Sequence, residues 1–147
     1  MTDYRHPSGE LPDVTWLLRR LAEEVPGVTS VVLVSSDGLQ LAAAGTIDRT
    51  LADSVSALTS GLLGIVKQLG RELSVGDPET FTIRYPHGHL AFVRIGDSAG
   101  LFASASVDTD LKRLGYGMGR FVEGVGHALT PQIRQQLHQN TLSRSAG

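Results

Sequence analysis

Apolar residues near the start of the chain recur at steps of three and four, which is the spacing of one helix face. The pattern predicts a helix over residues 13–25, with Asp13 as its N-cap and Pro26-Gly27 as its end. The apolar stripe of this helix consists of Val14, Leu17, Leu18, Leu21 and Val25. Residues 1–10 before it are polar and rich in turn formers, so we expect this segment to be disordered.

A run of β-branched residues over 28–34 follows, and a second apolar run covers 39–44. Asp37-Gly38 lies between the two runs. An Asp-Gly pair in this place is a strong hairpin signal, because the tight turn needs a positive φ that glycine adopts without strain. The two runs are therefore predicted to be neighbouring antiparallel strands.

A long helical pattern then covers residues 48–73, with Asp48 as its N-cap. Its apolar stripe consists of Leu51, Val55, Leu58, Leu62, Val66, Leu69 and Leu73. Residues off this stripe are also small or apolar, namely Ala52, Ala57, Gly61, Leu63, Gly64 and Ile65. Because a surface helix is normally polar there, we expect this helix to be buried on two sides.

Alternating residues over 80–85 predict a half-buried strand, and apolar runs over 90–95 and 101–107 complete an antiparallel meander. A last helix is predicted to open at 108–110 and to end near Pro131. The order α-ββ-α-βββ-α predicts an α+β fold, an α/β sandwich whose five-stranded antiparallel sheet carries helices on its faces. Residues 11–131 form the predicted domain, and the polar residues 132–147 are expected to be a flexible tail.

Composition narrows the class of protein. Charged residues make up 19% of the 147 residues, below the roughly 25% typical of soluble domains, so part of the surface is expected to meet a partner. A net charge of −2 argues against nucleic acid or anionic lipid as partners, and the absence of cysteine excludes disulfides and thiol nucleophiles. Neither a secretory signal nor a membrane-length apolar run is present, so we expect a cytoplasmic protein without direct membrane insertion.

No candidate catalytic set emerges from the sequence. The His87-Gly88-His89 segment is interpreted as a turn, because nothing near it has the spacing of further metal ligands. Gly115, Gly117 and Gly119 lie inside a predicted helix, whereas a dinucleotide fingerprint follows a strand directly. His127 is interpreted as a core histidine, and no G-x-S-x-G segment occurs. We therefore expect no enzyme, no cofactor and no metal.

Small residues on the long helix predict a side that faces a partner. Ala57, Gly61 and Gly64 would let a second helix approach closely, although each internal glycine costs about 1 kcal/mol relative to alanine. A leucine buried against the partner contributes about 1.5–3 kcal/mol, which can outweigh that cost. A strand over 80–85 at the sheet edge would also need protection. These features predict a homodimer.

An ordered set of packing and turn residues resembles a known family. The set runs from Trp16-Leu17-Leu18 and Val25–Val28 through Val32–Leu39 and Leu41-Ala42 to Ala57–Leu62 and Leu90–Val93. In these residues, which span roughly 13–130, the chain is similar to the roadblock / dynein light-chain family in its bacterial single-domain form. The resemblance implies a profilin-like fold. The chain departs from the family in the glycines of its last predicted helix, namely Gly115, Gly117, Gly119, Gly124 and Gly126.

The resemblance implies a homodimer joined through the long helix and the strand over 80–85, often as one continuous sheet. It also implies a non-catalytic regulator or scaffold that binds a small Ras-like GTPase and modulates its nucleotide state in bacterial signalling. A sensor-kinase-like protein is a further implied partner. The preponderance of arginine over lysine among the 13 basic residues fits a GC-rich actinobacterial genome.

The predicted interface lies on the long helix and the edge strand and consists of Ala57, Ser60, Gly61, Gly64, Ile65, Gln68, Thr82 and Arg84. Two alternatives stay open at this point. One is a structural adaptor that leaves GTP turnover unchanged, and the other is a small-molecule sensor with a pocket between sheet and helix.

Overall fold

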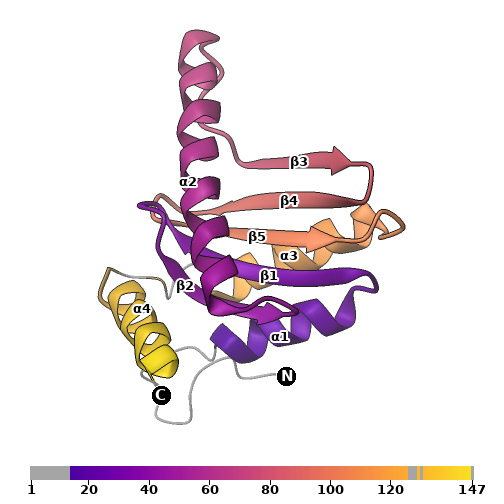
Figure 1. Cartoon of the computed structure of the whole chain (residues 1–147). Coiled ribbons are helices and arrows are strands. Elements are labelled where there is room, and N and C mark those ends of the chain that lie inside the picture. The colour runs from indigo at the N-terminus through magenta and orange to yellow at the C-terminus, as the bar shows by residue number, and fades with distance from the viewer. Residues whose placement is uncertain (1–13, 126–128, 130, 147) are drawn as a thin grey trace.

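The computed structural model describes residues 14–125, 129 and 131–146. The predicted order α-ββ-α-βββ-α is confirmed, and a further helix follows it (Figure 1). The elements are α1 (Val14–Glu24), β1 (Val28–Ser35), β2 (Gln40–Gly45), α2 (Arg49–Glu72), β3 (Thr80–Tyr85), β4 (Gly88–Ile95), β5 (Ala99–Ala105), α3 (Leu111–Val125) and α4 (Pro131–Ala146).

All five strands form one antiparallel sheet in the order β2-β1-β5-β4-β3. This sheet, with helices on both faces, confirms the predicted α+β fold class. The last two strands begin two residues earlier than predicted, at Gly88 and Ala99, because the turns before them are shorter than the polar sequence indicates. The expected disorder of residues 1–10 concerns residues outside the described part of the chain.

The larger core lies between the sheet and the helices α1 and α3. Leu18 and Val14 of α1 and Leu114 and Met118 of α3 are almost fully buried there. Strand residues such as Leu33 supply the other side of this layer. The helix α2 crosses the opposite face of the sheet, so the molecule has three layers (Figure 1).

The hairpin between β1 and β2 has the predicted turn. Gly38 has a φ of +86°, and its N–H donates to the Ser35 oxygen at 3.0 Å. The Leu39 N–H donates to Ser35 Oγ at 3.0 Å, which ties the turn to the end of β1. The Asp-Gly signal therefore predicted both the position and the backbone conformation of this turn.

Residues 132–146 belong to a helix, whereas the sequence predicts a flexible tail over 132–147. Pro131, interpreted as a helix end, is the first residue of α4, a position that suits proline because its missing N–H is not needed in the first turn. Leu137 of α4 is buried, and Ile133 packs against the larger core. The sequence does not indicate this helix because its few apolar residues, Ile133, Leu137 and Leu142, are too sparse among polar ones to form an extended stripe.

The helix α4 is attached to the first residues of β2. His138 Nδ1 donates to the Gln40 oxygen at 3.1 Å, and Thr141 Oγ1 donates to the Leu41 oxygen at 3.1 Å. Arg134 Nη1 adds a bond of 3.1 Å to the Ser98 oxygen in the turn before β5. These tertiary hydrogen bonds hold α4 over the start of the edge strand β2. A covering helix is a common protection of sheet edges.

Candidate functional site

The candidate site is the outward side of α2, a helix whose two ends are both fixed. Asp48, as predicted, caps the first turn, where its Oδ1 accepts from the Leu51 N–H at 2.8 Å. At the other end the Val75 N–H donates to the Gly70 oxygen at 3.0 Å, and Ser74 adopts a φ of 57°. This pattern closes the last turn in the manner of a Schellman motif.

The sheet-facing side of α2 carries small residues. Ala52, Ser56 and Thr59 are buried against the sheet, where Val32 and Phe102 provide the opposing bulk. Ser56 Oγ donates to the Ala52 oxygen at 2.7 Å, so its hydroxyl is satisfied inside the helix. Small side chains at these positions let the helix lie close to the strands. The larger apolar residues of α2 lie on its other sides.

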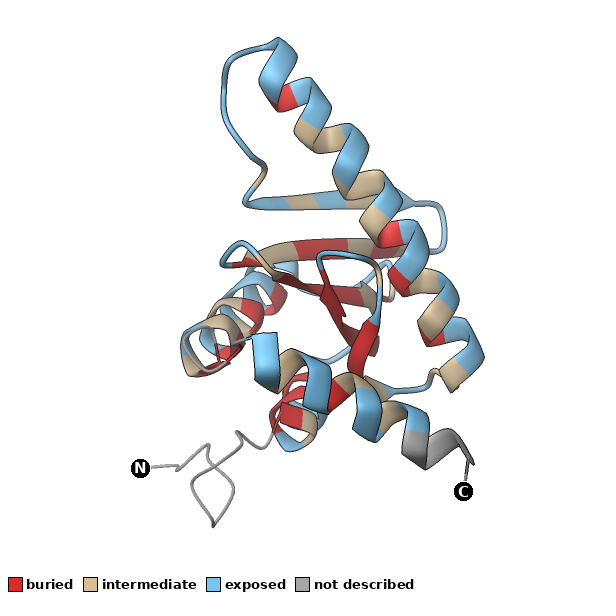
Figure 2. Cartoon of the chain, turned by 90° about the vertical axis from the view of Figure 1, so that its left-hand side faces the viewer, coloured by how far each residue is buried: buried red, intermediate tan, exposed pale blue. Residues whose placement is uncertain are grey.

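The leucines of α2 are largely exposed. We call the set Leu51, Leu58, Ile65, Leu69 and Leu73 the exposed leucine face, on which Leu58 is 71% and Leu73 is 69% accessible. Figure 2 shows exposed residues along the part of α2 that rises above the sheet. Most of the apolar stripe predicted from the sequence therefore does not face the core. Of the stripe residues, only Val55 packs against the smaller core between α2 and the sheet. Exposed apolar surface of this kind marks an interaction site.

A groove separates the leucine side of α2 from β3. Its volume is about 290 Å³, and its walls are almost entirely apolar. Phe81, whose ring stacks on Phe92 at a centroid distance of 4.9 Å, forms part of its floor. The remaining lining residues are Val55, Leu58, Thr59, Leu62, Ile83, Tyr85, Leu90 and Phe102.

β3 is an edge strand of the sheet, because within the described chain it pairs with β4 alone. Its residues alternate between the two faces. Phe81, Ile83 and Tyr85 face the α2 side, and Tyr85 is 48% exposed. The main-chain groups along its outer edge are free to pair with another strand.

The structure places the predicted interface residues on two sides of the sheet. Ala57, Gly61, Gly64 and Gln68 form one exposed stripe of α2, which lies next to the exposed leucine face. Apart from the neighbouring backbone of α2, no atom of the described chain lies within 4 Å of the Cβ position of Gly61 or Gly64, so neither glycine serves packing inside it.

The other predicted residues differ in exposure. Ile65 is 64% exposed and belongs to the leucine face, whereas Ser60 is half-buried and donates to the Ser36 oxygen at 3.2 Å. Thr82 and Arg84 are exposed but alternate with the groove residues of β3, so they face the α1 and α3 side of the sheet. The helix and strand residues therefore do not form one continuous patch within a single chain.

Sequence reasoning missed the residues that make the site most apolar. Leu58, Leu69 and Leu73 were assigned to a stripe without a stated partner, and Val75 and Tyr85 were not singled out, although they are 75% and 48% exposed. The sequence signal for these residues is that they are hydrophobic in a helix and at an edge strand. Which side of the helix meets the sheet depends on tertiary packing.

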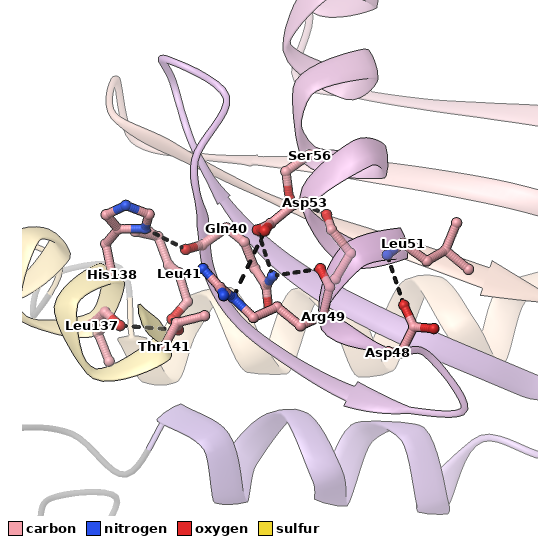
Figure 3. Close-up of polar contacts among 11 residues, drawn as sticks. Gln40, Leu41, Asp48, Arg49, Leu51, Asp53, Ser56, Leu137, His138 and Thr141 are labelled. Atoms are coloured by element: carbon pink, nitrogen blue, oxygen red, sulfur yellow. Dashed lines mark hydrogen bonds and ion pairs between the residues drawn. The ribbon is translucent and has the colours of Figure 1, made fainter. Parts of the chain in front are cut away.

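A polar network anchors the N-terminal end of α2 to β2 and α4 (Figure 3). The buried Gln40 donates through Nε2 to Asp53 Oδ1 at 2.9 Å, and its Nε2 lies 3.5 Å from the Arg49 oxygen. Arg49 Nε also approaches Asp53 Oδ2 at 3.7 Å. His138 of α4 binds the main-chain oxygen of the same glutamine. Gln40 thus links three elements, with its side chain bound to α2 and its main-chain oxygen bound to α4.

The structure shows no arrangement suited to metal binding among the described residues. His89 is buried, with its Nε2 donating to the Val107 oxygen at 3.2 Å, while His87 is exposed in the hairpin turn. His127 lies outside the described residues. In the part of the chain that is described, no helix is both long and apolar enough to cross a bilayer.

The geometry was compared with known proteins. The roadblock/LC7 domain of Streptomyces avermitilis is 32% identical, with a TM-score of 0.75, and the match covers 78% of this chain and 96% of that one. MglB of Myxococcus xanthus has a TM-score of 0.74 at 16% identity, over 79% of this chain and 94% of that one. A structure described as MglB with a tetrameric arrangement has a TM-score of 0.73 at 12% identity, over 96% and 98%.

A comparison with curated protein sequences found no match. The Roadblock/LC7 domain family, in contrast, matches this sequence over residues 14–105. This range runs from the start of α1 to the end of β5 and therefore includes α2, the exposed leucine face and the edge strand β3. The chain belongs to the Roadblock/LC7 domain family.

Proposed function

We propose that this protein is a non-catalytic, homodimeric regulator that binds a small Ras-like GTPase and modulates its nucleotide state. The observation that carries the proposal is the exposed leucine face of α2 beside the open edge of β3. Family membership supports the same reading, because the resemblance implies partners of this class. The proposed setting is the cytoplasm of an actinobacterium, with a sensor-kinase-like protein as a further partner.

The dimer part of the proposal follows from the energetics of the leucine face. Leu58, Ile65 and Leu73 are each more than 60% exposed in the single chain. Burial of each such side chain contributes about 1.5–3 kcal/mol, so a second copy that covers several of them gains stability quickly. A contact between identical faces is self-complementary about a two-fold axis.

The edge of β3 offers a second element of the same interface. Two β3 strands related by a two-fold axis run antiparallel and can join their sheets through main-chain hydrogen bonds. Thr82 and Arg84 would then meet the partner copy along this edge, while Ala57 and Gly61 allow a close helix approach on the other side of the sheet. The predicted residues thus become parts of one interface only in the assembled pair. A structure of this fold is described as MglB with a tetrameric arrangement, which supports self-association as such.

The GTPase part of the proposal requires a preference for one nucleotide state. A regulator shifts an equilibrium only by the difference between its affinities for the two states. The paired α2 helices would present a surface of small and apolar residues to the mobile switch regions of the GTPase. An adaptor, in contrast, would bind without changing nucleotide turnover.

The test uses a purified small Ras-like GTPase from the same organism, loaded with GDP or with a GTP analogue. We expect calorimetric titration of the full chain to give different affinities for the two forms, and GTP hydrolysis to change in rate when the chain is added. Equal binding to both forms with unchanged hydrolysis would contradict regulation and favour the adaptor. Light scattering that gives 15.7 kDa at micromolar concentration would contradict the homodimer.

A further inference from the structure

A pocket of about 140 Å³ lies between α2 and the end of the sheet where β1, β4 and β5 meet. Its α2 wall consists of Thr59, Ser60, Leu63 and Lys67, which recur at helical spacing on one flank. This flank is turned away from Leu58 and Ile65 of the exposed leucine face. The pocket is therefore distinct from the apolar groove on the β3 side, and only Thr59 borders both.

Two cations line this pocket without a partner. Lys67 of α2 and Arg94 of β4 are both half-buried, and neither side chain forms a hydrogen bond or an ion pair with any residue that the structure describes. Partial burial of a cation is unfavourable unless an opposite charge or an acceptor compensates it. Two such cations on one small pocket favour an anion between them.

The inner wall of the pocket adds a hydroxyl without a partner and an apolar surface. Thr59 is only 6% exposed, and its hydroxyl makes no hydrogen bond to the described chain. The Phe92 ring lies directly against Gly100, where a Cβ would overlap with the ring. The pocket therefore combines an aromatic and aliphatic floor with a hydrogen-bonding group and two positive charges.

Asp77 and Asp97 limit the charge that the pocket accepts. Both residues line it and are exposed, whereas Lys67 and Arg94 are half-buried. With equal numbers of positive and negative groups, the site does not suit a polyphosphate, whose charge would meet both carboxylates. One negative charge placed toward Lys67 and Arg94 fits this arrangement best.

We propose that this pocket binds a small organic monoanion, a carboxylate whose apolar part is about the size of one six-membered ring. The size follows from the volume, since a cavity of about 150 Å³ accommodates benzene. The carboxylate would accept from Arg94, Lys67 and the Thr59 hydroxyl, and the ring would lie against Leu63 and the edge of Phe92. Because the pocket lies on the other flank of α2, ligand and second copy can bind at the same time.

The test follows amide chemical shifts of the full chain during titration with benzoate. Benzyl alcohol and benzylamine are the matched neutral and cationic probes. We expect benzoate to shift amides over 59–67 and 92–100 saturably, with a dissociation constant in about the millimolar range for a ligand of this size. The two other probes should bind at least about tenfold more weakly, since they lack the charge-assisted hydrogen bonds.

Variants separate the site from a non-specific effect. Arg94→Ala and Lys67→Ala should each weaken benzoate binding, and Arg94→Lys should restore part of it. Arg113→Ala removes an exposed cation of α3 and should leave the titration unchanged. Equal binding of benzoate and benzyl alcohol, tighter binding of benzylamine, or no saturable shift at these amides would overturn the proposal, with thermal unfolding verifying that each variant is folded. The dimer and GTPase assays do not depend on these outcomes.

Discussion

A Cβ atom at Gly117 of α3 would lie 2.8 Å from Leu21 Cδ1 of α1 and 3.3 Å from Val25 Cγ2. The two helices therefore meet at a separation that glycine permits. Gly117→Ala would force the buried Leu21 to move, and overpacking of this kind costs about 1–3 kcal/mol. Because alanine also gains up to about 1 kcal/mol of helix propensity, we expect a net loss of up to about 2 kcal/mol in the free energy of unfolding. Denaturant titration at fixed protein concentration measures it.

The same helix provides a matched control for this substitution. Gly115 is exposed, and apart from the neighbouring backbone of its own helix no atom of the described residues lies within 4 Å of its Cβ position. Gly115→Ala should therefore stabilise the chain by up to about 1 kcal/mol, through helix propensity alone. If both alanine variants stabilise the protein equally, close packing between α1 and α3 is not the reason for glycine at 117.

Loss of the Asp48 cap should weaken the start of α2. In Asp48→Ala the Leu51 N–H loses the acceptor that lies 2.8 Å away, and we expect a loss of about 0.5–2 kcal/mol in stability. Asp48→Asn keeps a side-chain oxygen and should retain most of it. Equal destabilisation of both variants by chemical denaturation would show that the carboxylate charge, and not the hydrogen bond, matters.

Removal of the buried Gln40 side chain should loosen the link between β2 and α2. Gln40→Ala deletes the donor to Asp53 Oδ1, and we expect a loss of about 1–3 kcal/mol in the free energy of unfolding. Gln136→Ala removes an exposed glutamine that bonds Asn140 at 3.2 Å, and it should change stability by less than about 0.5 kcal/mol. Similar thermal melts for both variants would contradict the role of the network.

A charge on the exposed leucine face should separate the proposed dimer. Leu58→Glu places a carboxylate where Leu58 is 71% exposed in the single chain, so the fold should persist while burial against a second copy becomes unfavourable. The molar mass measured by light scattering at micromolar concentration should fall from twice 15.7 kDa to 15.7 kDa. Leu111→Glu, at a leucine of α3 that is 42% exposed, is the control and should remain dimeric. A Leu58→Glu protein that keeps the mass of two chains would argue against this face.

The sequence predicted those features that local chemistry determines. Asp37-Gly38 specified the hairpin because the turn requires a positive φ, and Asp48 specified the start of α2 because its side chain can accept a main-chain N–H. Helix periodicity located α2, but it could not decide which side meets the sheet. That choice depends on bulky strand residues such as Phe102, which form a cluster with the buried Ala52 while Leu58 stays exposed.

The missed parts depend on contacts between distant residues. The helix α4 has no extended apolar stripe, and its hydrogen bonds from His138 and Thr141 reach β2 almost 100 residues earlier in the chain. Arg94 and Lys67 are separated by a loop and a strand, so no spacing in the sequence indicates a shared pocket. Alternation along β3 places Thr82 and Arg84 on one side of the sheet and Ile83 on the other, but it does not show which side faces α2. The predicted interface therefore joined Thr82 and Arg84 with residues of α2, which lies on the Ile83 side.

The placement of α4 bears on how many copies can join. A sheet with two open edges can add a further sheet at each end, and repeated head-to-tail addition yields a filament without a defined length. Here His138 and Thr141 occupy main-chain oxygens at the beginning of β2, the edge opposite β3. Pairing of β3 with its symmetry mate would use up the other edge in both copies. Growth along the sheet would then stop at two chains, and a polar C-terminal helix would act as the terminator of a finite assembly.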